Sequence, residues 1–430
     1  MTNADIKAQD LKHIWHPCSQ MKDYETYPLI PIKRGKGVWL EDFDGNRYID
    51  GISSWWVNLF GHANPYINNR IKEQIENLEH VIFAGFTHEP AVTLAKRLVE
   101  ITPDGLEKIF FADNGSSAIE VAIKMSFHYF KNKGRIRPMV LSLKNSYHGE
   151  TIGALSVGDV ALYKETYNEI LIQSRQVLSP ALADEALALR DLEETLKKES
   201  GHICAFIIEP LVQCAGYMKM YAPSYITKAK ALCERYDVHL IADEIAVGFG
   251  RTGTLFACEQ AAVTPDFMCL SKGLTGGYLP LSVVMTTDDV YRAFYCDYNE
   301  GKAFLHSHSY TGNPIACAVA NAVLDIFENE QVITRNQTLI TIMEKGLERL
   351  SKLPRVRNIR QHGMIGAFDL EGFSPDRRVG MEVYEYALGQ GVLLRPLGHT
   401  VYFMPPYAIT PDELEKLIQV AFEAVKRLKD

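Results

Sequence analysis

The sequence predicts an α/β protein whose main domain is a mostly parallel sheet covered by helices. Short apolar runs alternate with helical patterns between about residues 61 and 318, and this alternation is typical of parallel sheets. Charged side chains follow two of these runs, as they do at the ligand-binding edge of an open sheet. From about residue 320 the pattern changes to two helices and a second group of strands, which indicates a smaller domain.

Composition limits the class of protein. The chain has 430 residues, 47% hydrophobic and 23% charged, as in ordinary globular proteins. Its formal charge is −8 with both signs interspersed, so nothing indicates a surface for nucleic acid or for an acidic membrane. Eight cysteines without a CxxC pair favour reduced thiols and a cytoplasmic protein. The polar N-terminus does not resemble a signal peptide, and no apolar run is long enough to predict a membrane span.

The first 60 residues combine a short polar segment, a hairpin and a pair of tryptophans. We expect two strands between residues 35 and 50, around an Asp-Gly-Asn turn at 44–46. Two histidines flank Trp15, but without further ligands at suitable spacing we expect no metal site. Trp55 and Trp56 fit either the core and an interface or the wall of a substrate site, and the sequence leaves both open.

The remaining elements are expected in a regular order. In the main domain, we expect helices over 66–79, 91–100, 118–129, 180–200 and 223–236, and strands over 108–112, 140–143, 203–208, 238–243, 267–270 and 281–286. Beyond it, we expect helices over 316–327 and 333–352, a strand–helix–strand unit over 365–370, 380–388 and 392–395, a strand over 401–404 and a closing helix over 411–427.

Two strand ends carry the most informative residues. One apolar run ends in Asp243 and Glu244, and the run Phe267–Leu270 is followed by Lys272. Ligands bind outside the carboxyl ends of strands in such sheets, so an acid and a primary amine are expected at one site. A pyridoxal phosphate enzyme needs this pair. Taken alone, each motif also fits a plain strand end or a surface turn, and the interpretation depends on the surrounding residues.

Three polar turns support a site at that edge. Gly115 and Ser116 lie between a strand and a helix, where backbone N–H groups suit a phosphate, although the turn also fits a simple helix cap. Tyr147 follows the next strand, where residues that contact ligands are common. The polar loop 306–314 precedes a helix, and its hydroxyl groups would reach a phosphate or only cap that helix.

Together these motifs resemble the class-III (ω-) aminotransferases of pyridoxal phosphate fold type I. The resemblance runs from about residue 12 to the end and includes Leu-Ile-Ala-Asp-Glu at 240–244, Gly-Phe-Gly-Arg-Thr-Gly at 248–253 and Gly-Asn-Pro at 312–314. It implies pyridoxal 5'-phosphate as cofactor, a homodimer with shared active sites, and a small domain built from both chain ends. We therefore expect an N-terminal segment 1–60 in the small domain, a large cofactor-binding domain over 61–318 and a C-terminal small domain over 319–430.

The resemblance also implies roles for individual residues. Lys272 would bond to the cofactor and move the proton, Asp243 would pair with the pyridine nitrogen, and Tyr147 would stack on the ring. The other expected contacts are Gly115 and Ser116 with the phosphate, Ser309 or Thr311 with the phosphate from the partner subunit, Glu209 beside the ring, and Trp55, Arg395, Arg251 and Tyr402 around the substrate. Within this set, Arg395 would bind the carboxylate of the substrate.

Further motifs narrow the substrate. The pointers are Trp-His-Pro at 15–17, Ser-Ser-Trp-Trp at 53–56 and the late Arg395. They resemble members that aminate 8-amino-7-oxononanoate in biotin biosynthesis, with S-adenosylmethionine as the expected donor and lysine as the other possibility. An ω-aminotransferase or aminomutase for another amino acid, diamine or semialdehyde is the alternative. Cys18 stands where many relatives have an aromatic residue, so no role of that residue is transferred here.

Overall fold

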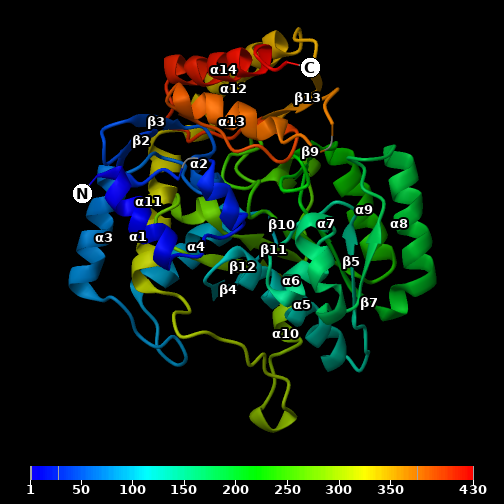
Figure 1. The fold of residues 1–430 in the computed structure, drawn as a ribbon. Coiled ribbons are helices and arrows are strands. Elements are labelled where there is room, and N and C mark those ends of the chain that lie inside the picture. The colour runs from blue at the N-terminus through cyan, green and yellow to red at the C-terminus, as the bar shows by residue number, and fades with distance from the viewer. Residues whose placement is uncertain (1, 28, 375, 430) are drawn as a thin grey trace. The chain divides into compact units, whose positions relative to one another are not determined.

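The computed structural model describes residues 2–27, 29–374 and 376–429, which form two compact units (Figure 1). The smaller unit joins Met1–Pro65 to Arg335–Asp430, and the larger unit is Tyr66–Thr334. The first boundary therefore lies five residues beyond the expected 60, and the second lies at 334 rather than 318. The second boundary is late because α11 (Pro314–Asn329) packs within the larger unit against α4 (Glu89–Ile101). Arg97 of α4 joins these two helices, because it donates to the Asn321 carbonyl at 2.9 Å and pairs with Asp325 at 2.8 Å.

The larger unit is built on a seven-stranded sheet with the order β4-β12-β11-β10-β7-β5-β6. Its strands are β4 (Lys108–Ala112), β5 (Met139–Leu143), β6 (Ser174–Val177), β7 (Ile203–Ile208), β10 (His239–Asp243), β11 (Phe267–Leu270) and β12 (Ser282–Thr286). The predicted mostly parallel sheet is confirmed, since only β12 runs antiparallel to its neighbours. Strand β6 was not predicted. A separate hairpin pairs β8 (Val212–Gln213) with β9 (Lys219–Met220).

Helices cover this sheet. The α-helices of the larger unit are α3 (Pro65–Asn77), α4, α5 (Gly115–Asn132), α6 (Ile152–Ser156), α7 (Ala161–Lys164), α8 (Glu185–Glu199), α9 (Pro223–Arg235), α10 (Asp288–Arg292) and α11, with 3-10 turns η2 (Glu165–Ile170), η3 (Ser200–His202), η4 (Ala257–Ala261), η5 (Lys272–Thr275) and η6 (Tyr298–Glu300). Helix α5 buries one face against the sheet, because its apolar residues repeat at helical spacing. Helix α8 packs against β6, and α9 packs against β10.

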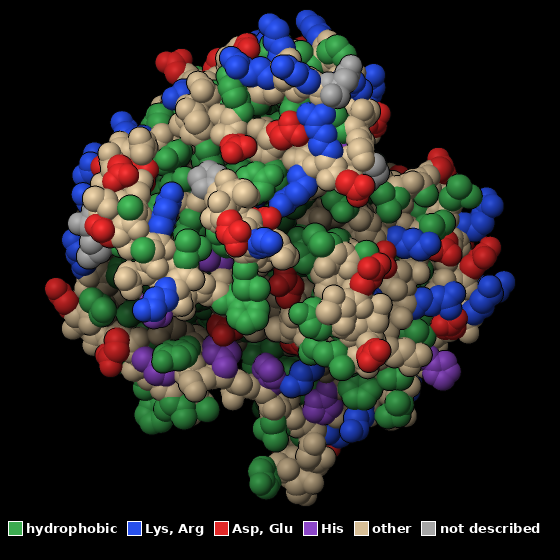
Figure 2. Space-filling model, viewed as in Figure 1, with side chains coloured by type: hydrophobic (Ala, Val, Ile, Leu, Met, Phe, Trp, Pro, Cys, Tyr) green, Lys and Arg blue, Asp and Glu red, His purple; other side chains and the backbone are tan. Residues whose placement is uncertain are grey.

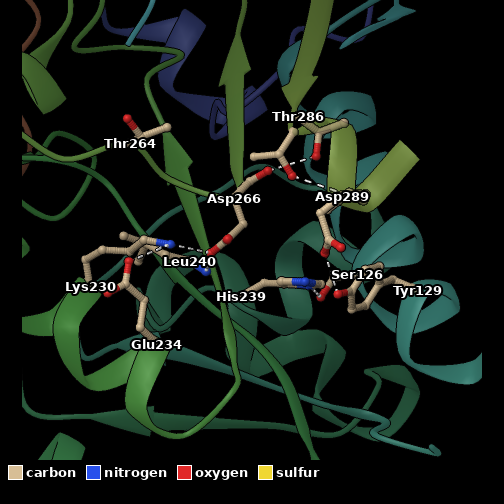
Figure 3. Close-up of polar contacts among 12 residues, drawn as sticks. Ser126, Tyr129, Lys230, Glu234, His239, Leu240, Thr264, Asp266, Thr286 and Asp289 are labelled. Carbon is tan, nitrogen blue, oxygen red and sulfur yellow. Dashed lines mark hydrogen bonds and ion pairs between the residues drawn. The ribbon is translucent and has the colours of Figure 1, made fainter. Parts of the chain in front are cut away.

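A polar network fixes the amino ends of β10 and β11 (Figure 3). The Asp266 carboxylate accepts hydrogen bonds from the Leu240 N–H at 2.7 Å and from Lys230 at 3.0 Å. His239, the first residue of β10, lies 2.8 Å from the Ser126 hydroxyl of α5. That hydroxyl donates its only hydrogen to the Cys204 carbonyl, so the His239 ring donates to Ser126. The carboxyl ends of the same strands, which carry the candidate site, are thereby held in register.

The smaller unit contains two sheets. One has the order β1-β2-β3-β15, and the other has the order β13-β14-β16. Their strands are β1 (Ile32–Lys36), β2 (Trp39–Asp42), β3 (Arg47–Asp50), β13 (Val356–His362), β14 (Ile365–Leu370), β15 (Val392–Leu393) and β16 (Thr400–Phe403), and the helices are α1 (Asn3–His13), η1 (Met21–Glu25), α2 (Ser53–Trp56), α12 (Val332–Leu350, which begins at the end of the larger unit), α13 (Val379–Gly389) and α14 (Pro411–Lys426). The predicted hairpin around residues 44–46 is confirmed by the antiparallel β2–β3 pair.

One expectation for the smaller unit was wrong, and two of its elements were not predicted. The strand–helix–strand unit does not form in one sheet: β14 pairs with β13 and β16, whereas β15 pairs with β3 from the other end of the chain. Strand β13 was missed, and it takes the edge position beside β14. The polar segment at the N-terminus is a helix, because the Thr2 hydroxyl and the Asp5 carboxylate form a capping box that begins α1.

Basic and acidic side chains occur side by side over most of the face that Figure 2 shows. Among the described residues, no helix combines the length and the apolar character required to cross a membrane.

Candidate active site

The register of the sheet brings Asp243 and Lys272 to the same edge. Strands β10 and β11 are parallel neighbours, and Asp243 pairs with Cys269, three residues before Lys272. Lys272 begins η5 with φ at 45°, in the left-handed region that residues with a side chain rarely adopt. The backbone thus turns sharply where β11 ends, which places the amine near the end of β10.

Burial lowers the pKa of Lys272, while the charges of Asp243 and Glu209 oppose this effect and the charge of Arg251 adds to it. Asp243, Glu209 and Arg251 therefore lie within electrostatic range of the amine. A lysine with a lowered pKa holds a larger fraction of the neutral amine, the form that acts as a nucleophile or a base. Lys272 is therefore suited to act both as a nucleophile and as a base.

Asp243 is clamped through both of its oxygens. Oδ1 accepts the Ile245 N–H at 3.1 Å, and Oδ2 accepts the Nδ1–H of His148 at 2.7 Å. His148 is 2% exposed, and its Nε2 has no hydrogen-bond partner among the described residues. The sequence predicted no role for His148, because residues 95 apart in sequence gave no sign of this contact. The clamp holds the carboxylate in a fixed orientation.

Glu209 is the second buried acid of this group. Its carboxylate accepts the Tyr147 N–H at 3.0 Å and the Cys214 N–H at 2.9 Å. Burial, followed by repulsion from Asp243, raises the pKa of Glu209 to about 8. At neutral pH Glu209 therefore keeps its proton.

Glu244, the neighbour of Asp243, has a structural role. It is 0% exposed and accepts the N–H groups of Ala257 at 2.9 Å and Cys258 at 2.7 Å, which begin η4. Burial raises the pKa of Glu244 to about 7. Of the two adjacent carboxylates at the end of β10, Asp243 is the one that raises the pKa of Lys272 most strongly.

The start of α5 forms a tight cradle. Asn114 caps the helix by accepting the Ser117 N–H at 3.0 Å, so the predicted capping is confirmed. A Cβ on Gly115 would lie 3.0 Å from the Ile245 side chain, so the helix start approaches the turn after Asp243 closely. The Ser116 hydroxyl accepts the Glu150 N–H at 3.2 Å, and a Cβ on Gly149 would meet that hydroxyl at 2.0 Å. The 145–150 loop thus packs directly on the helix N-terminus, where an anion is favoured.

The other expected contacts of the larger unit differ in exposure. Tyr147 is partly buried, and its hydroxyl donates to Glu150 at 2.9 Å. Ser309 is exposed, whereas the Thr311 hydroxyl donates to the His308 carbonyl at 2.8 Å within its own turn. Arg251 is 1% exposed. Of the two loop hydroxyls, Ser309 is therefore the one presented to the surroundings.

The smaller unit holds Trp55, Arg395 and Tyr402, three of the four residues expected around the substrate. The Arg395 guanidinium lies 5.3 Å from the centre of the Trp55 ring, and it donates to the Cys18 carbonyl at 3.3 Å. Arg395 is exposed and pairs with no carboxylate among the described residues. An arginine stacked on an indole with donors still available is suited to a carboxylate ligand.

Trp55 lies in an uncommon backbone conformation. The four residues of α2 all have positive φ, at 52°, 46°, 72° and 72° from Ser53 to Trp56. Left-handed backbone costs about 1–2 kcal/mol for each residue with a Cβ, so the turn persists only because other contacts hold it. Asp50, which is fully buried, accepts the Ser54 N–H at 2.9 Å and the Ser54 hydroxyl at 2.7 Å.

The two tryptophans, for which the sequence left two uses open, differ in burial. Trp56 is 4% exposed, and its Nε1–H donates to the Tyr402 hydroxyl at 3.0 Å. Tyr402 is itself 2% exposed. Trp55 is 42% exposed, so it offers its indole face to a ligand while Trp56 and Tyr402 stabilise the unit from inside.

The polar groups at the carboxyl edge of the sheet in the larger unit fit pyridoxal phosphate. The cradle at the start of α5 suits the phosphate, the clamped Asp243 suits the protonated pyridine nitrogen, and the Lys272 amine suits the aldehyde. Among the described residues, no group of three or more His, Cys, Asp or Glu side chains is placed to bind a metal ion.

Comparisons with known proteins identify the family. The class-III aminotransferase model matches residues 20–425. An adenosylmethionine-8-amino-7-oxononanoate aminotransferase of Helicobacter pylori is 49% identical over 99% of this chain and 98% of its own length, and one of Geobacter sulfurreducens is 41% identical over 96% and 95%. The crystal structure of the enzyme of that name from Methanocaldococcus jannaschii superposes with a TM-score of 0.95 at 36% identity, covering 98% of this chain and 99% of that one. The chain therefore belongs to the class-III aminotransferases and is a pyridoxal 5'-phosphate-dependent enzyme of fold type I.

Proposed function

We propose that this enzyme transfers an amino group to the carbonyl of 8-amino-7-oxononanoate and forms 7,8-diaminononanoate, a step of biotin biosynthesis. The observation that carries the proposal is the similarity, over nearly the full length, to relatives named for this reaction. The exposed Arg395 stacked on Trp55 agrees with it, because the acceptor is a carboxylate on a long apolar chain. The same names favour S-adenosylmethionine as donor.

Each charged residue of the larger unit would have one task. Bound pyridoxal phosphate supplies an electron sink for the carbon that loses its proton. Asp243, held by His148 and Ile245, keeps the pyridine nitrogen protonated. Lys272 takes the proton from the donor carbon as a neutral amine and returns it at the cofactor side. Glu209 stays neutral beside Asp243 at neutral pH, so it adds no second negative charge.

A second subunit would complete the site. Ser309 is exposed in a loop of the larger unit, and the hydroxyl of a partner's copy would reach the phosphate, as the family resemblance implies. We therefore infer a homodimer, and a location in the cytoplasm agrees with the eight cysteines, which are present as thiols.

The donor and the acceptor are tested separately. Holoenzyme is mixed with S-adenosylmethionine or with lysine, and the absorbance of the lysine-bound cofactor is followed until it disappears. The aminated enzyme then receives 8-amino-7-oxononanoate, and the diamine is measured. If lysine converts the cofactor and S-adenosylmethionine does not, only the assignment of the donor changes. If no diamine forms with either donor, the proposed reaction is contradicted and another ω-aminotransferase substrate is favoured.

The role of Arg395 is tested by substitution. Arg395→Ala should weaken binding of the ketoacid by about 2–5 kcal/mol, because one partner of a charge pair is lost. Arg395→Lys should restore only part, since lysine cannot form two parallel hydrogen bonds. Measured Michaelis constants for the ketoacid decide the matter, and an unchanged value in Arg395→Ala would mean that the carboxylate binds elsewhere.

A further inference from the structure

The left-handed turn Ser53–Trp56 is held by a chain of hydrogen bonds that runs away from the substrate residues. Asn58 donates to His62 Nδ1 at 3.2 Å, so the other ring nitrogen of His62 carries a hydrogen and donates to Asp50 at 3.0 Å. Asp50 in turn holds the backbone and the hydroxyl of Ser54, the residue before Trp55. The chain ends at Ser54, directly before Trp55, the exposed indole of the turn.

The rest of the turn is fixed from a different side. The Ser53 hydroxyl donates to the Met404 carbonyl at 2.7 Å, and Trp56 donates to Tyr402. These two contacts anchor the first and last residues of the turn to β16 and the segment after it. Asp50 is therefore the group that fixes the middle of the turn, where Ser54 and Trp55 have φ of 46° and 72°.

We propose that Asp50 is a positioning residue for the substrate carboxylate. By holding Ser54 in the left-handed conformation, Asp50 directs the Trp55 indole under the Arg395 guanidinium and so sets the direction in which Arg395 offers its donors. The inference rests on the proposed function, in which Arg395 receives the carboxylate of the acceptor. Asp50 contacts no reacting atom, so it should affect recognition of the acceptor and leave the reaction with the donor unchanged.

Asp50→Asn is the first variant. One Asp50 oxygen accepts the Ser54 N–H, and the other accepts the Ser54 hydroxyl and His62. An amide accepts through only one oxygen, so Asp50→Asn cannot hold both the backbone and the hydroxyl of Ser54. We expect the Michaelis constant for 8-amino-7-oxononanoate to rise about tenfold, because a small displacement of a positioning contact has a large effect. The rate of the donor half-reaction should stay within about twofold of wild type by the same argument. Equal effects on both half-reactions would overturn the proposal.

Asp42→Asn is the matched control. Asp42 is also buried in the smaller unit, at 1% exposure, and it accepts hydrogen bonds from Asn46 and Asn3 in the β2–β3 turn and at α1. The same chemical change there should lower thermal stability without altering the Michaelis constant for the acceptor. If Asp42→Asn raises that constant as much as Asp50→Asn does, the effect is one of general stability and the proposal fails.

Two variants of Ser54 separate positioning from folding. Ser54→Ala and Ser54→Gly both lose the hydroxyl that donates to Asp50, but glycine adopts positive φ without a steric cost. Ser54→Gly should therefore unfold at the higher temperature of the two and yet have the higher Michaelis constant for the acceptor, because its turn is less restricted. If the less stable of the two variants has the higher Michaelis constant for the acceptor, the positioning role of Asp50 is contradicted.

Coupling to Arg395 supplies the decisive readout. In an Arg395→Ala background, Asp50→Asn should raise the constant for the acceptor by less than about twofold, because the two residues act on one contact. If Asp50→Asn raises the Michaelis constant for the acceptor as much in the Arg395→Ala background as in wild type, Asp50 acts elsewhere.

Nonanoate makes the result independent of the proposed substrate. Its binding to wild-type holoenzyme, measured directly in the absence of the acceptor, should be far tighter than that of 1-nonanol, and Asp50→Asn should weaken it about tenfold through Arg395. If 8-amino-7-oxononanoate is not aminated but this pattern holds, only the proposed reaction fails. If the ketoacid is aminated and Asp50→Asn binds nonanoate normally, or if nonanoate does not bind to wild-type holoenzyme at all, the role of Asp50 fails.

Discussion

At Lys272, a strained backbone and an enclosed amine occur in the same residue. Its φ of 45° and its lowered pKa both depend on the surrounding structure, and neither would persist in an isolated turn. Lys272→Ala should therefore reduce turnover by at least roughly 10²–10⁴-fold, the range for loss of a general base. Borohydride reduction of wild-type holoenzyme followed by peptide mapping should label Lys272. A label on any other lysine would remove Lys272 from the mechanism.

The charge of Asp243 is the second prediction for a single residue. Asp243→Asn preserves the shape of the side chain but removes the charge that His148 and the cofactor nitrogen require. We expect the single-turnover rate with the donor to fall about 10²–10³-fold, as when one stabilising group is removed from an active site. Cofactor binding, measured by dialysis and absorbance, should change far less. A near-normal single-turnover rate would contradict this role.

Among the elements, the 145–150 loop joins the two ends of the cofactor site. Tyr147 holds Glu209, His148 holds Asp243, and Gly149 lies against Ser116 at the start of α5. One loop after β5 thus connects both buried acids to the expected phosphate cradle. Its conformation should control cofactor affinity more than any single contact within it.

Gly149→Ala tests this loop. Gly149 has φ of 124°, and its Cβ would meet the Ser116 hydroxyl at 2.0 Å, so Ser116 must move. Gly134→Ala is the control, because Gly134 has φ of 76° and nothing within 4 Å of the added Cβ. Both should lose about 1–2 kcal/mol of stability from the backbone. Only Gly149→Ala should also release pyridoxal phosphate on dilution, measured by absorbance, and equal release from both variants would contradict the cradle.

For the whole molecule, His239 predicts how stability depends on pH. Burial lowers the pKa of His239 to about 4, below its ordinary value of 6.5. The unfolded chain binds this proton at higher pH than the folded chain, so the stabilising contribution is complete above pH 6.5 and is lost as pH falls toward 4. The loss reaches up to about 3 kcal/mol.

His239→Gln isolates this contribution. The amide of glutamine can still donate to Ser126 but does not titrate in this range. Urea unfolding of both proteins at a series of pH values should show that the difference in the free energy of unfolding between wild type and variant shrinks between pH 6.5 and 4. A constant difference across that range would mean that His239 does not hold a lowered pKa.

The sequence by itself determined the local elements and the chemistry of the site. Apolar runs such as β7 and β11 were located to the residue, because a buried parallel strand is a continuous apolar segment between polar turns. Asp243 and Lys272 were recognised for a related reason: a charged residue that follows such a segment stands at the edge of the sheet. The antiparallel direction of β12 could also be inferred from the sequence. Residues 271–281 are too few for the crossover that a parallel strand requires.

Only the tertiary structure decided which distant residues support that chemistry. The His148 clamp on Asp243, the pairing of β15 with β3 and the hold of Asp50 on the Trp55 turn each depend on three-dimensional contacts that composition and periodicity do not encode. The positive φ angles of Ser53–Trp56 oppose the local preference of serine and tryptophan, so no local pattern could predict them. They exist because buried hydrogen bonds from other parts of the fold outweigh the local cost.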